Sequence, residues 1–481
     1  MLFNSLDFAF FLPIVFTIYW LIPKTKIRSQ NLLLLFASYV FYGWWDWRFL
    51  SLIIFSTLVD FLVGLEIQRS TSSKRKKLML WISIVVNLGF LGFFKYFDFF
   101  IENFQEAFTF LGYNFGATSS LNIILPVGIS FYTFQTLSYS IDVYKGKLNP
   151  TKDLIQFSAY VSFFPQLVAG PIERAVNLLP QFSKSRSFDV AQAVDGMRQI
   201  LWGLFKKIVI ADNCAIIVNQ IFTDYTEFNG STLLIGAVLF AFQIYGDFSG
   251  YSDIAIGVAK LFGFRLMKNF AFPYFSRDIA EFWRRWHISL STWFRDYVYI
   301  PLGGSFGSSY KKVRNVMIIF LVSGFWHGAN WTFIVWGLLN AIYFLPLLLL
   351  RKNRKNIGPV TQDRLFPSFN EFCQILLTFA LTVVAWVFFR SPTVTVAMDY
   401  LLGMFNLSLF NLPDILPKKL MLYVFVMLLT EWFHRDREFG LDFRSGFLVQ
   451  WARWSIYLFI VFLILFETRF HDQAEFIYFQ F

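Results

Sequence analysis

Apolar runs long enough to cross a membrane recur along the whole chain. Crossing a bilayer core of about 30 Å takes about 20 helical residues, and runs of this kind extend from residue 8 to residue 468. Of the 481 residues, 56% are hydrophobic and only 15% are charged, whereas soluble domains carry about 25% charged residues. Because lipid cannot satisfy exposed backbone polar groups, such segments fold as helices. The sequence predicts a polytopic membrane protein and excludes a soluble enzyme and a disordered chain.

The runs predict an all-α transmembrane bundle of about 10 to 12 spans with additional re-entrant and interfacial helices. Two runs are expected to be broken: 121–144 contains Pro126 and Gly128, and 154–170 ends in PQLVAGP. There is no fixed-period repeat and no segment that reads as a soluble domain, so we predict one domain over 1–481. The runs lie at 8–23, 30–43, 48–67, 78–100, 121–144, 154–170, 198–222, 231–246, 314–325, 331–350, 372–390, 417–433 and 451–468.

The net charge of +11 comes from 42 Lys and Arg against 31 Asp and Glu. Basic residues gather in the short loops 24–28, 69–77 and 351–355, and basic short loops indicate the cytoplasmic side. The N-terminus and residues 323–331 are then expected towards the outer side. This topological explanation is favoured over nucleic-acid binding. Two cysteines far apart in apolar stretches exclude a disulfide framework.

Polar residues concentrate between 247 and 331. The stretch FAFQIYGDFSGYSDIAIGVAKLFGF places Asp247, Ser249 and Asp253 among apolar residues and glycines, and an ionisable residue at membrane depth indicates a functional site. An interfacial loop whose acids face water is an equally good interpretation. Further on, WRRWHISLSTWFRDY interleaves charges with Trp, and helical spacing would put Arg284 and His287 on one face. An amphipathic helix along the interface would explain most of these charges.

The stretch SGFWHGANWTFIVWG places His327 in an apolar context beside Gly328. A lone buried histidine is more often structural than catalytic, but neighbouring glycines allow close backbone approach. No HExxH, CxxC or GxSxG motif occurs, which argues against a metal site and a serine hydrolase. The remaining chemistry is a histidine that acts as general base on a hydroxyl in a dry site.

The sequence resembles the membrane-bound O-acyltransferase family, and in particular the bacterial alginate O-acetyltransferase-like branch of that family. The resemblance covers nearly the whole chain, and WRRWHISLSTWFRDYVYIPLGG followed by WHGANW is its most specific part. The matching strings, in order, are QTLSYSIDVYKGK (135–147), FFPQLVAGPIERA (163–175), DFSGYSDIAIGVAKLFGF (247–264), NFAFPYFSRDIAEFWRRWHISLSTWFRDYVYIPLGG (269–304) and SGFWHGANWTFIVWG (323–337).

The resemblance implies a catalytic core at about 121–340 around a central tunnel. It assigns His327 as the essential histidine and His287 as the second catalytic position, with no metal. Asn340 stands where many relatives carry a further histidine, so no role is assigned to it. The residues expected to contact substrate or line the tunnel are Trp326, Asn330, Trp331, Arg284, Asp296, Tyr297, Asp247, Ser249, Asp253, Gln135 and Tyr139.

The resemblance also implies the reaction. A thioester donor such as acetyl-CoA, with no bound cofactor, would deliver acetyl from the cytoplasm to an extracytoplasmic polysaccharide such as alginate. His327 would act as general base and His287 would orient or polarise, while amides near Gly324 or Gly328 or Trp indoles would stabilise the oxyanion. An extracytoplasmic partner protein and a bacterial inner-membrane location are expected. The alternatives are D-alanyl or other acyl transfer to a cell-wall polymer, a transporter of glycan intermediates, and a catalytically inactive scaffold.

Overall fold

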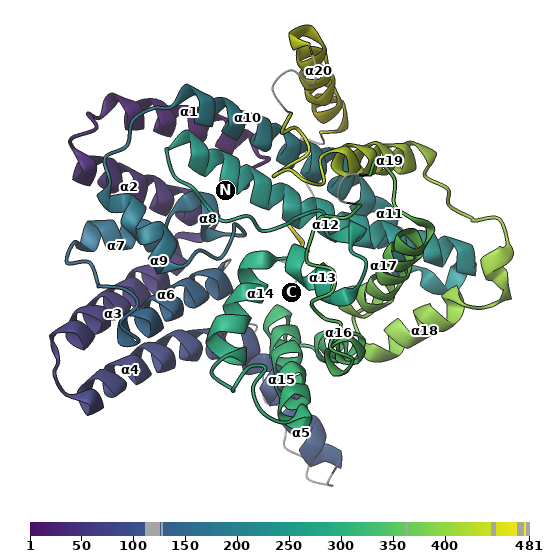
Figure 1. The fold of residues 1–481 in the computed structure, drawn as a ribbon, viewed down its shortest axis with the longest axis horizontal. Helices are drawn as coiled ribbons and strands as arrows, with labels where there is room; N and C mark the ends of the chain where they lie inside the picture. Colours follow the sequence, from purple (N-terminus) through teal and green to yellow (C-terminus); the bar gives the residue numbers. More distant parts are fainter. Residues whose placement is uncertain (111–125, 127, 362–363, 444–448, 469–475, 478–481) are drawn as a thin grey trace. The chain divides into compact units, whose positions relative to one another are not determined.

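The computed structural model confirms an all-α protein (Figure 1). It describes residues 1–110, 126, 128–361, 364–443, 449–468 and 476–477. Within these ranges the regular structure consists of α-helices, short 3₁₀ turns and π-helical segments, and no strand occurs. The dominance of helix follows from the apolar composition, because a helix satisfies its backbone hydrogen bonds within one segment.

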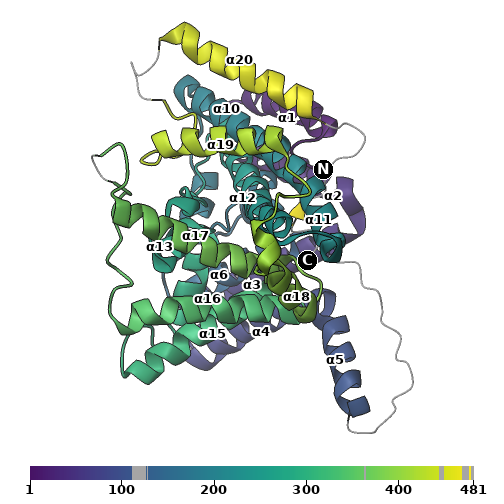
Figure 2. The ribbon, with the colours of Figure 1, turned by 90° about the vertical axis from the view of Figure 1, so that its right-hand side faces the viewer.

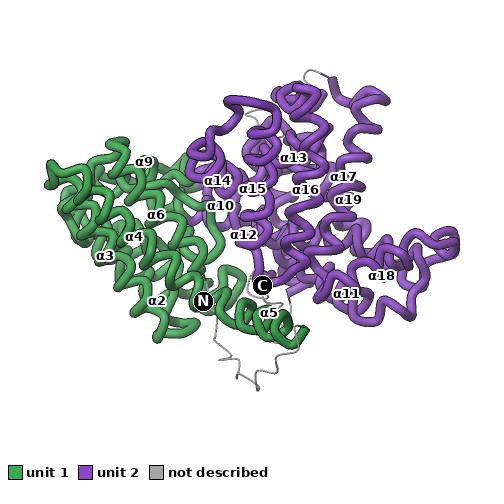
Figure 3. Tube along the Cα trace, turned by 90° about the horizontal axis from the view of Figure 1, so that it is seen from below, with its two compact units in different colours: residues 1–193, 259–266 green, residues 194–258, 267–481 purple. Residues whose placement is uncertain are grey.

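The chain forms two compact units, coloured separately in Figure 3. The first consists of residues 1–193 and 259–266, and the second of residues 194–258 and 267–481. The single domain over 1–481, with a core at about 121–340, stays a prediction.

The first unit is a set of helices in which α3 and α4 pack against α6, and α2 packs against α7. Buried Asp60 of α3 holds this packing together by accepting hydrogen bonds from Ser83, from Asn87 at 2.8 Å and from Ser140 at 2.9 Å. The helices of this unit are α1 (Leu6–Leu21), α2 (Ile27–Asp46), α3 (Leu50–Arg69), α4 (Ser73–Leu91), α5 (Phe97–Phe110), α6 (Ile129–Tyr144), α7 (Leu154–Val161), α8 (Phe164–Leu167) and α9 (Ala175–Leu178).

Both predicted breaks can be compared with this unit. The run 154–170 is broken as expected, because α7 ends at Val161 and only the short α8 follows. Most of the apolar stretch before α6 lies outside the described residues. Gly128, which precedes α6, has φ +74°, and a Cβ there would lie 2.7 Å from the carbonyl oxygen of Leu167. A glycine is therefore required at this break.

The second unit contains the polar segment and the long helix α12. Figure 2 shows α15, α16 and α17 running side by side in it. Its helices are α10 (Val190–Leu204), α11 (Asp212–Thr223), α12 (Gly230–Leu261), α13 (Ile279–Arg285), α14 (Ile288–Phe294), α15 (Ser309–His327), α16 (Trp331–Leu349), α17 (Phe369–Arg390), α18 (Val394–Met404), α19 (Lys418–Phe433) and α20 (Gln450–Glu467), and residues 190–193 of α10 and 259–261 of α12 belong to the first unit.

Six helical segments within the described residues are long and apolar enough to cross a membrane. The first is two helices rather than one, because the extended backbone of Asp46 separates α2 from α3. Two shorter apolar helices, α1 and α18, add to these. A total of 10 to 12 spans stays a prediction. The six segments are Ile27–Arg69, Ser73–Phe110, Gly230–Leu261, Trp331–Leu349, Phe369–Arg390 and Gln450–Glu467.

Two sequence interpretations of the polar segment are wrong. Asp247 is buried on the continuous helix α12, so the interfacial loop with acids facing water does not form. The expected amphipathic helix through Arg284 and His287 breaks after Arg285, because Trp286 is extended and His287 has φ +43°. Glu281 is buried there and accepts from the guanidinium groups of Arg277 and Arg285, whereas Arg284 and Arg295 are exposed. Buried charge needs such partners.

Two glycines bring α15 and α16 into close contact. A Cβ at Gly337 of α16 would lie 2.5 Å from the carbonyl oxygen of Phe320, and a Cβ at Gly324 of α15 would overlap that of Phe333. The helices can approach this closely only because these positions lack a Cβ. The contact places His327, the last residue of α15, against the body of the second unit.

Candidate functional site

The two predicted catalytic histidines are buried in the second unit and share an aromatic neighbour. His327 ends α15, and His287 lies in the connection between α13 and α14. The Trp326 indole lies 4.9 Å from the His327 ring and 6.2 Å from the His287 ring, measured between centroids. The fold thus places two histidines that stand 40 positions apart in the sequence next to the same indole ring.

A single asparagine fixes the His287 ring. Asn269 Oδ1 accepts from the Ser289 backbone N–H at 3.2 Å and from the Ser289 hydroxyl at 2.8 Å. Because a backbone N–H only donates, this atom of the amide is the oxygen. His287 Nδ1 lies 3.1 Å from the same oxygen and therefore carries the proton. Asn269 Nδ2 donates to the Ser252 hydroxyl at 3.0 Å, which orients the amide.

His287 consequently presents a lone pair at Nε2. Burial lowers the pKa of His287 to about 3, so the ring is neutral at physiological pH. His287 lies outside the six candidate spans. The Phe248 ring packs on the imidazole at 4.5 Å, nearly perpendicular to it. Nε2 makes no hydrogen bond with the parts of the chain that the structure describes. An acceptor of this kind can receive a hydrogen bond from a substrate hydroxyl or a proton from it.

His327 sits in an aromatic cage formed by Trp326, Trp336 and Phe389. The Trp336 ring lies 5.0 Å and the Phe389 ring 5.3 Å from the imidazole, both at steep angles. Gly328 follows in extended backbone and ends α15, whereas Gly324 lies inside the helix, where its amide serves the helix's own hydrogen bonds. Of the two glycine amides considered from the sequence, only that of Gly328 remains a candidate oxyanion donor.

Asp247 and Asp253, two of the acids predicted to line a tunnel, each form an ion pair with a buried lysine. Asp247 lies 2.8 Å from Lys207 Nζ, and its other oxygen accepts from the backbone N–H of Ile477 at 2.7 Å. Phe476 packs on Phe248, the ring that also contacts His287. The carboxylate thus carries charge that is already compensated.

A second lysine pairs with the other two predicted residues of α12. Lys206 Nζ lies 2.6 Å from Asp253 and donates to Ser249 at 2.9 Å. Lys206 and Lys207 are consecutive residues of the π-helix Phe205–Ala211, which follows α10. The predicted tunnel-lining role of Asp247, Ser249 and Asp253 stays a prediction.

The remaining predicted residues lie in four different places. Asn330 caps α16 and donates to the carbonyl of Pro392, and Trp331 is 55% exposed. Arg284 is exposed and donates to backbone carbonyls at 353 and 356. Asp296 pairs with its neighbour Arg295, and Tyr297 packs on Trp293. Gln135 and Tyr139 are buried in the first unit, where Gln135 Nε2 donates to the Tyr160 carbonyl and Tyr139 packs on Phe157.

Sequence reasoning missed four residues that support the site. Asn269 gives no local signal, because it stands in an ordinary loop. Lys206 and Lys207 interrupt one apolar run, and Glu431 interrupts another. A charged residue within a membrane-spanning run indicates a functional site, so the sequence did contain a pattern that could have identified these three residues. The Tyr245 hydroxyl lies 2.8 and 2.9 Å from the two carboxylate oxygens of Glu431. Among the residues described, no cluster of three or more His, Cys, Asp or Glu could hold a metal ion.

The sequence is similar to a protein-family model and to several bacterial proteins. A family model described as the membrane-bound O-acyltransferase family matches residues 151–385. The chain is 41% identical to a probable alginate O-acetylase of Azotobacter vinelandii over an alignment of 421 residues. This alignment covers 86% of this chain and 80% of that protein. The chain is 35% identical over 437 residues to a peptidoglycan O-acetyltransferase of Helicobacter pylori, covering 85% and 80%. A teichoic acid D-alanyltransferase of Bacillus subtilis is 30% identical over 236 residues, covering 46% and 58%.

Proposed function

Because this chain belongs to the membrane-bound O-acyltransferase family and is an O-acyltransferase, we propose that it O-acetylates an extracytoplasmic polysaccharide such as alginate, with acetyl-CoA or a similar thioester as donor. The observation that carries the proposal is the buried pair of histidines that share Trp326 as a neighbour, with His287 held in one tautomer by Asn269. The names of the relatives supply the acceptor class, since two of them are acetyl-transferring enzymes of alginate and peptidoglycan.

In the proposed reaction His327 is the general base. An acceptor hydroxyl attacks the thioester carbonyl, its proton passes to the imidazole, and a tetrahedral oxyanion forms. The intermediate collapses with cleavage of the C–S bond, and the leaving thiolate takes the proton back from His327. General-base help of this kind contributes about 10² to 10⁴ in rate. The aromatic cage around His327 favours this role, because it excludes water that would hydrolyse the thioester.

His287 serves as a positioning group in this scheme. Its Nε2 lone pair accepts a hydrogen bond and so orients the acceptor hydroxyl, but in this tautomer it offers no proton to an oxyanion. The oxyanion would instead be met by the amide of Gly328 or by a Trp indole. Trp326, a neighbour of both rings, would form the wall against which the acyl group lies.

The proposal places the chain in the inner membrane of a bacterium, with 10 to 12 spans around a tunnel. The donor would enter from the cytoplasm, on the side of the basic loops 24–28, 69–77 and 351–355. The acceptor would arrive from outside, where His327 is expected, and a separate extracytoplasmic protein would carry the acyl group onward or present the polysaccharide.

The first experiment measures acetylation of the cell-surface polysaccharide. A strain lacking this protein is complemented with the wild type, with His327→Ala, or with Trp47→Ala as a control at an exposed aromatic residue. Membrane levels of all three are compared by immunoblot. The proposal expects acetylation with the wild type and Trp47→Ala and a loss of at least about 100-fold with His327→Ala. Full acetylation by a normally inserted His327→Ala protein would overturn the assignment of the base.

A second experiment identifies the donor. Membranes containing the protein are supplied with radiolabelled acetyl-CoA or with radiolabelled D-alanine on a carrier protein. Label in the polysaccharide from acetyl-CoA alone supports the proposed reaction. Label from the aminoacyl carrier alone would replace it with D-alanyl transfer, the reaction in the name of the Bacillus subtilis relative.

A further inference from the structure

An asparagine is buried in α16, a helix long and apolar enough to cross a membrane. The Asn340 side chain is 3% exposed, whereas only 33% of the apolar window of this helix is buried. A polar side chain that turns from lipid into the protein indicates a hydrogen bond to another element or a functional role. Asn340 has no part in the proposed reaction, so its partners indicate what it does.

The hydrogen bonds of Asn340 define the orientation of its amide. Nδ2 donates to the backbone carbonyl of Trp336, one turn earlier in α16, at 2.8 Å. Oδ1 faces Nε1 of Trp283 at 3.2 Å, and because an indole N–H only donates, the amide oxygen is the acceptor. Trp283 belongs to α13, which packs against α16. The amide thus joins the two helices through a hydrogen bond from an indole.

Trp283 connects this hydrogen bond to the aromatic cage of His327. Its ring lies 5.7 Å from the Trp336 ring at 72° and 5.5 Å from the Phe320 ring of α15 at 65°. The Trp336 ring in turn lies 5.0 Å from the His327 imidazole. Aromatic contacts restrain the distance between rings, whereas a hydrogen bond also fixes direction. The bond to Asn340 therefore fixes where the Trp283 ring meets the Trp336 ring.

The helix α13 also leads to the second histidine. It ends at Arg285, and His287 follows two residues later. Trp286, between them, packs at 5.1 Å on Trp386, which stacks on Trp336 at 5.7 Å. Packed interiors transmit displacements because they contain few voids. A shift of α13 along α16 would therefore change the surroundings of both histidines.

We propose that Asn340 is a positioning residue of the acyl-transfer site: by accepting from the Trp283 indole it holds α13 against α16 and so sets how Trp336 packs on His327. Asn340 acts through the two tryptophans rather than on the substrate. The inference rests on the proposed role of His327 as general base. A displacement of about 1 Å can cost a factor of about 10² in rate, so such a residue affects turnover from outside the reacting groups.

A double-mutant cycle tests this role. Asn340→Leu removes the acceptor at similar volume, and Trp283→Phe removes the donor but keeps a ring. The kcat and KM values for acetyl transfer from acetyl-CoA to an oligosaccharide are measured on the reconstituted full chain. The hydrogen bond favours the held arrangement by a factor of about 2 to 13, so each variant should lower kcat by about that factor with little change in KM. In the double variant the second substitution should add less than about a twofold loss.

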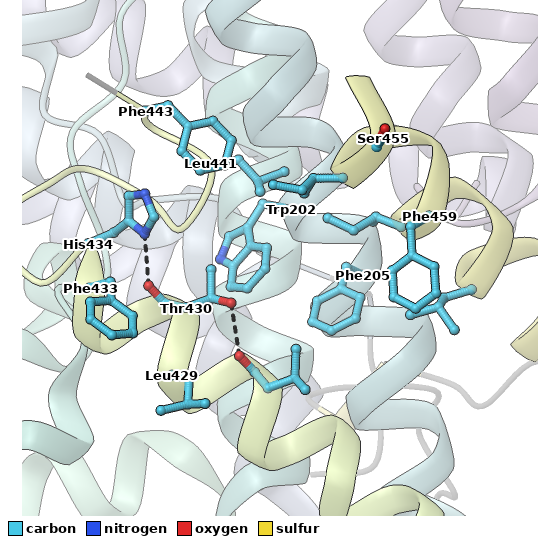
Figure 4. A pocket seen from close by; sticks show the side chains of 14 residues that line it. Trp202, Phe205, Leu429, Thr430, Phe433, His434, Leu441, Phe443, Ser455 and Phe459 are labelled. Carbon is cyan, nitrogen blue, oxygen red and sulfur yellow. Dashed lines mark hydrogen bonds between the residues drawn. The ribbon is translucent and has the colours of Figure 1, made fainter. Parts of the chain in front are cut away.

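Trp202→Phe is the matched control. It makes the same substitution in the wall of an apolar cavity of about 670 Å³ lined by α19 and α20 (Figure 4), where the indole N–H makes no hydrogen bond with any described residue. This variant should keep the wild-type kcat. Thermal unfolding is measured for all variants, because a bond that only holds two helices together would lower the melting temperature without lowering kcat. Additive losses of kcat in the cycle, or full kcat in Asn340→Leu, would overturn the proposal.

A measurement that needs no activity separates this inference from the proposed function. The chain has four histidines, so in solid-state NMR of protein labelled with ¹⁵N-histidine the His327 signal is assigned by its loss in His327→Gln. Moving the Trp336 ring changes the ring current at this imidazole, so the signal should shift in Asn340→Leu and Trp283→Phe but not in Trp202→Phe. An unmoved His327 signal in Asn340→Leu would overturn the positioning role even in an active enzyme. A shifted signal in a wild-type-folded protein that transfers no acetyl would support the positioning role and refute the proposed function.

Discussion

Replacing Asn269 by Leu should lower the turnover of the enzyme far more than its affinity for substrate. Asn269 Oδ1 is the acceptor that keeps the proton of His287 on Nδ1 and the lone pair on Nε2. Leucine has a similar volume but accepts no hydrogen bond. The substitution therefore releases the imidazole without opening a large cavity in this buried region.

The magnitude follows from two contributions. The lost hydrogen bond is worth about 0.5–1.5 kcal/mol. A released ring has two flip states and two tautomers, so about one arrangement in four is productive, which adds about 0.8 kcal/mol. Together these raise the activation free energy by about 1.3–2.3 kcal/mol, which predicts a fall in kcat of about 10- to 50-fold. KM should change little, since Asn269 is buried behind the ring.

The assay follows transfer of radiolabelled acetyl from acetyl-CoA to an oligosaccharide by the reconstituted full chain, so that kcat and KM are obtained separately. Ser252→Ala is the matched control. It removes the hydroxyl that receives the Asn269 Nδ2 hydrogen bond but leaves the Oδ1 contact with His287 intact. We expect at most about a fivefold effect from that one bond. A folded Asn269→Leu protein with the wild-type kcat would refute the positioning of His287 by Asn269.

Three further predictions concern stability, measured by thermal unfolding of the protein in detergent. The pKa of His287 is about 3 in the folded protein and about 6.5 in the unfolded chain, so the unfolded state binds more protons and the protein loses stability as the pH is lowered through 6.5. His287→Gln should reduce this loss between pH 6.5 and pH 5 by about 1.6 kcal/mol, and equal losses in both proteins would contradict this. Gly337→Ala should destabilise because its Cβ would lie 2.5 Å from a backbone oxygen of α15, whereas Gly89→Ala, with open space around its Cβ, should not; similar melting temperatures would argue against the close helix contact. Lys207→Met should cost about 3–5 kcal/mol by leaving the Asp247 charge buried and unpaired, and a loss below about 1 kcal/mol would mean that this ion pair contributes little.

The fold class could be predicted because membrane helices are specified locally. A run of about 20 apolar residues is sufficient to define a spanning helix. The break after Val161 was likewise visible in the sequence, in the Pro and Gly that follow. Local patterns failed between 247 and 287. There the sequence of α12 reads as polar and glycine-rich, yet α12 is a continuous buried helix packed tightly against α10. A Cβ at Gly250 would lie only 2.8 Å from the Gly203 carbonyl oxygen, so this packing needs a glycine.

For the site, the motifs around His287 and His327 predict two catalytic residues, and the sequence by itself determined that they belong to an apolar, helical, membrane-bound enzyme. Only the tertiary structure decided what each polar group does. It showed that Asp247 and Asp253, which the sequence predicts to line a tunnel, are ion-pair partners of two lysines, and it assigned the His287 tautomer through Asn269. The physical reason is that hydrogen bonds and ion pairs depend on distances of about 3 Å between atoms, and in this chain the partners stand 18 to 47 positions apart. Hydropathy and spacing describe neighbours along a helix, whereas these distances are set by how the helices pack.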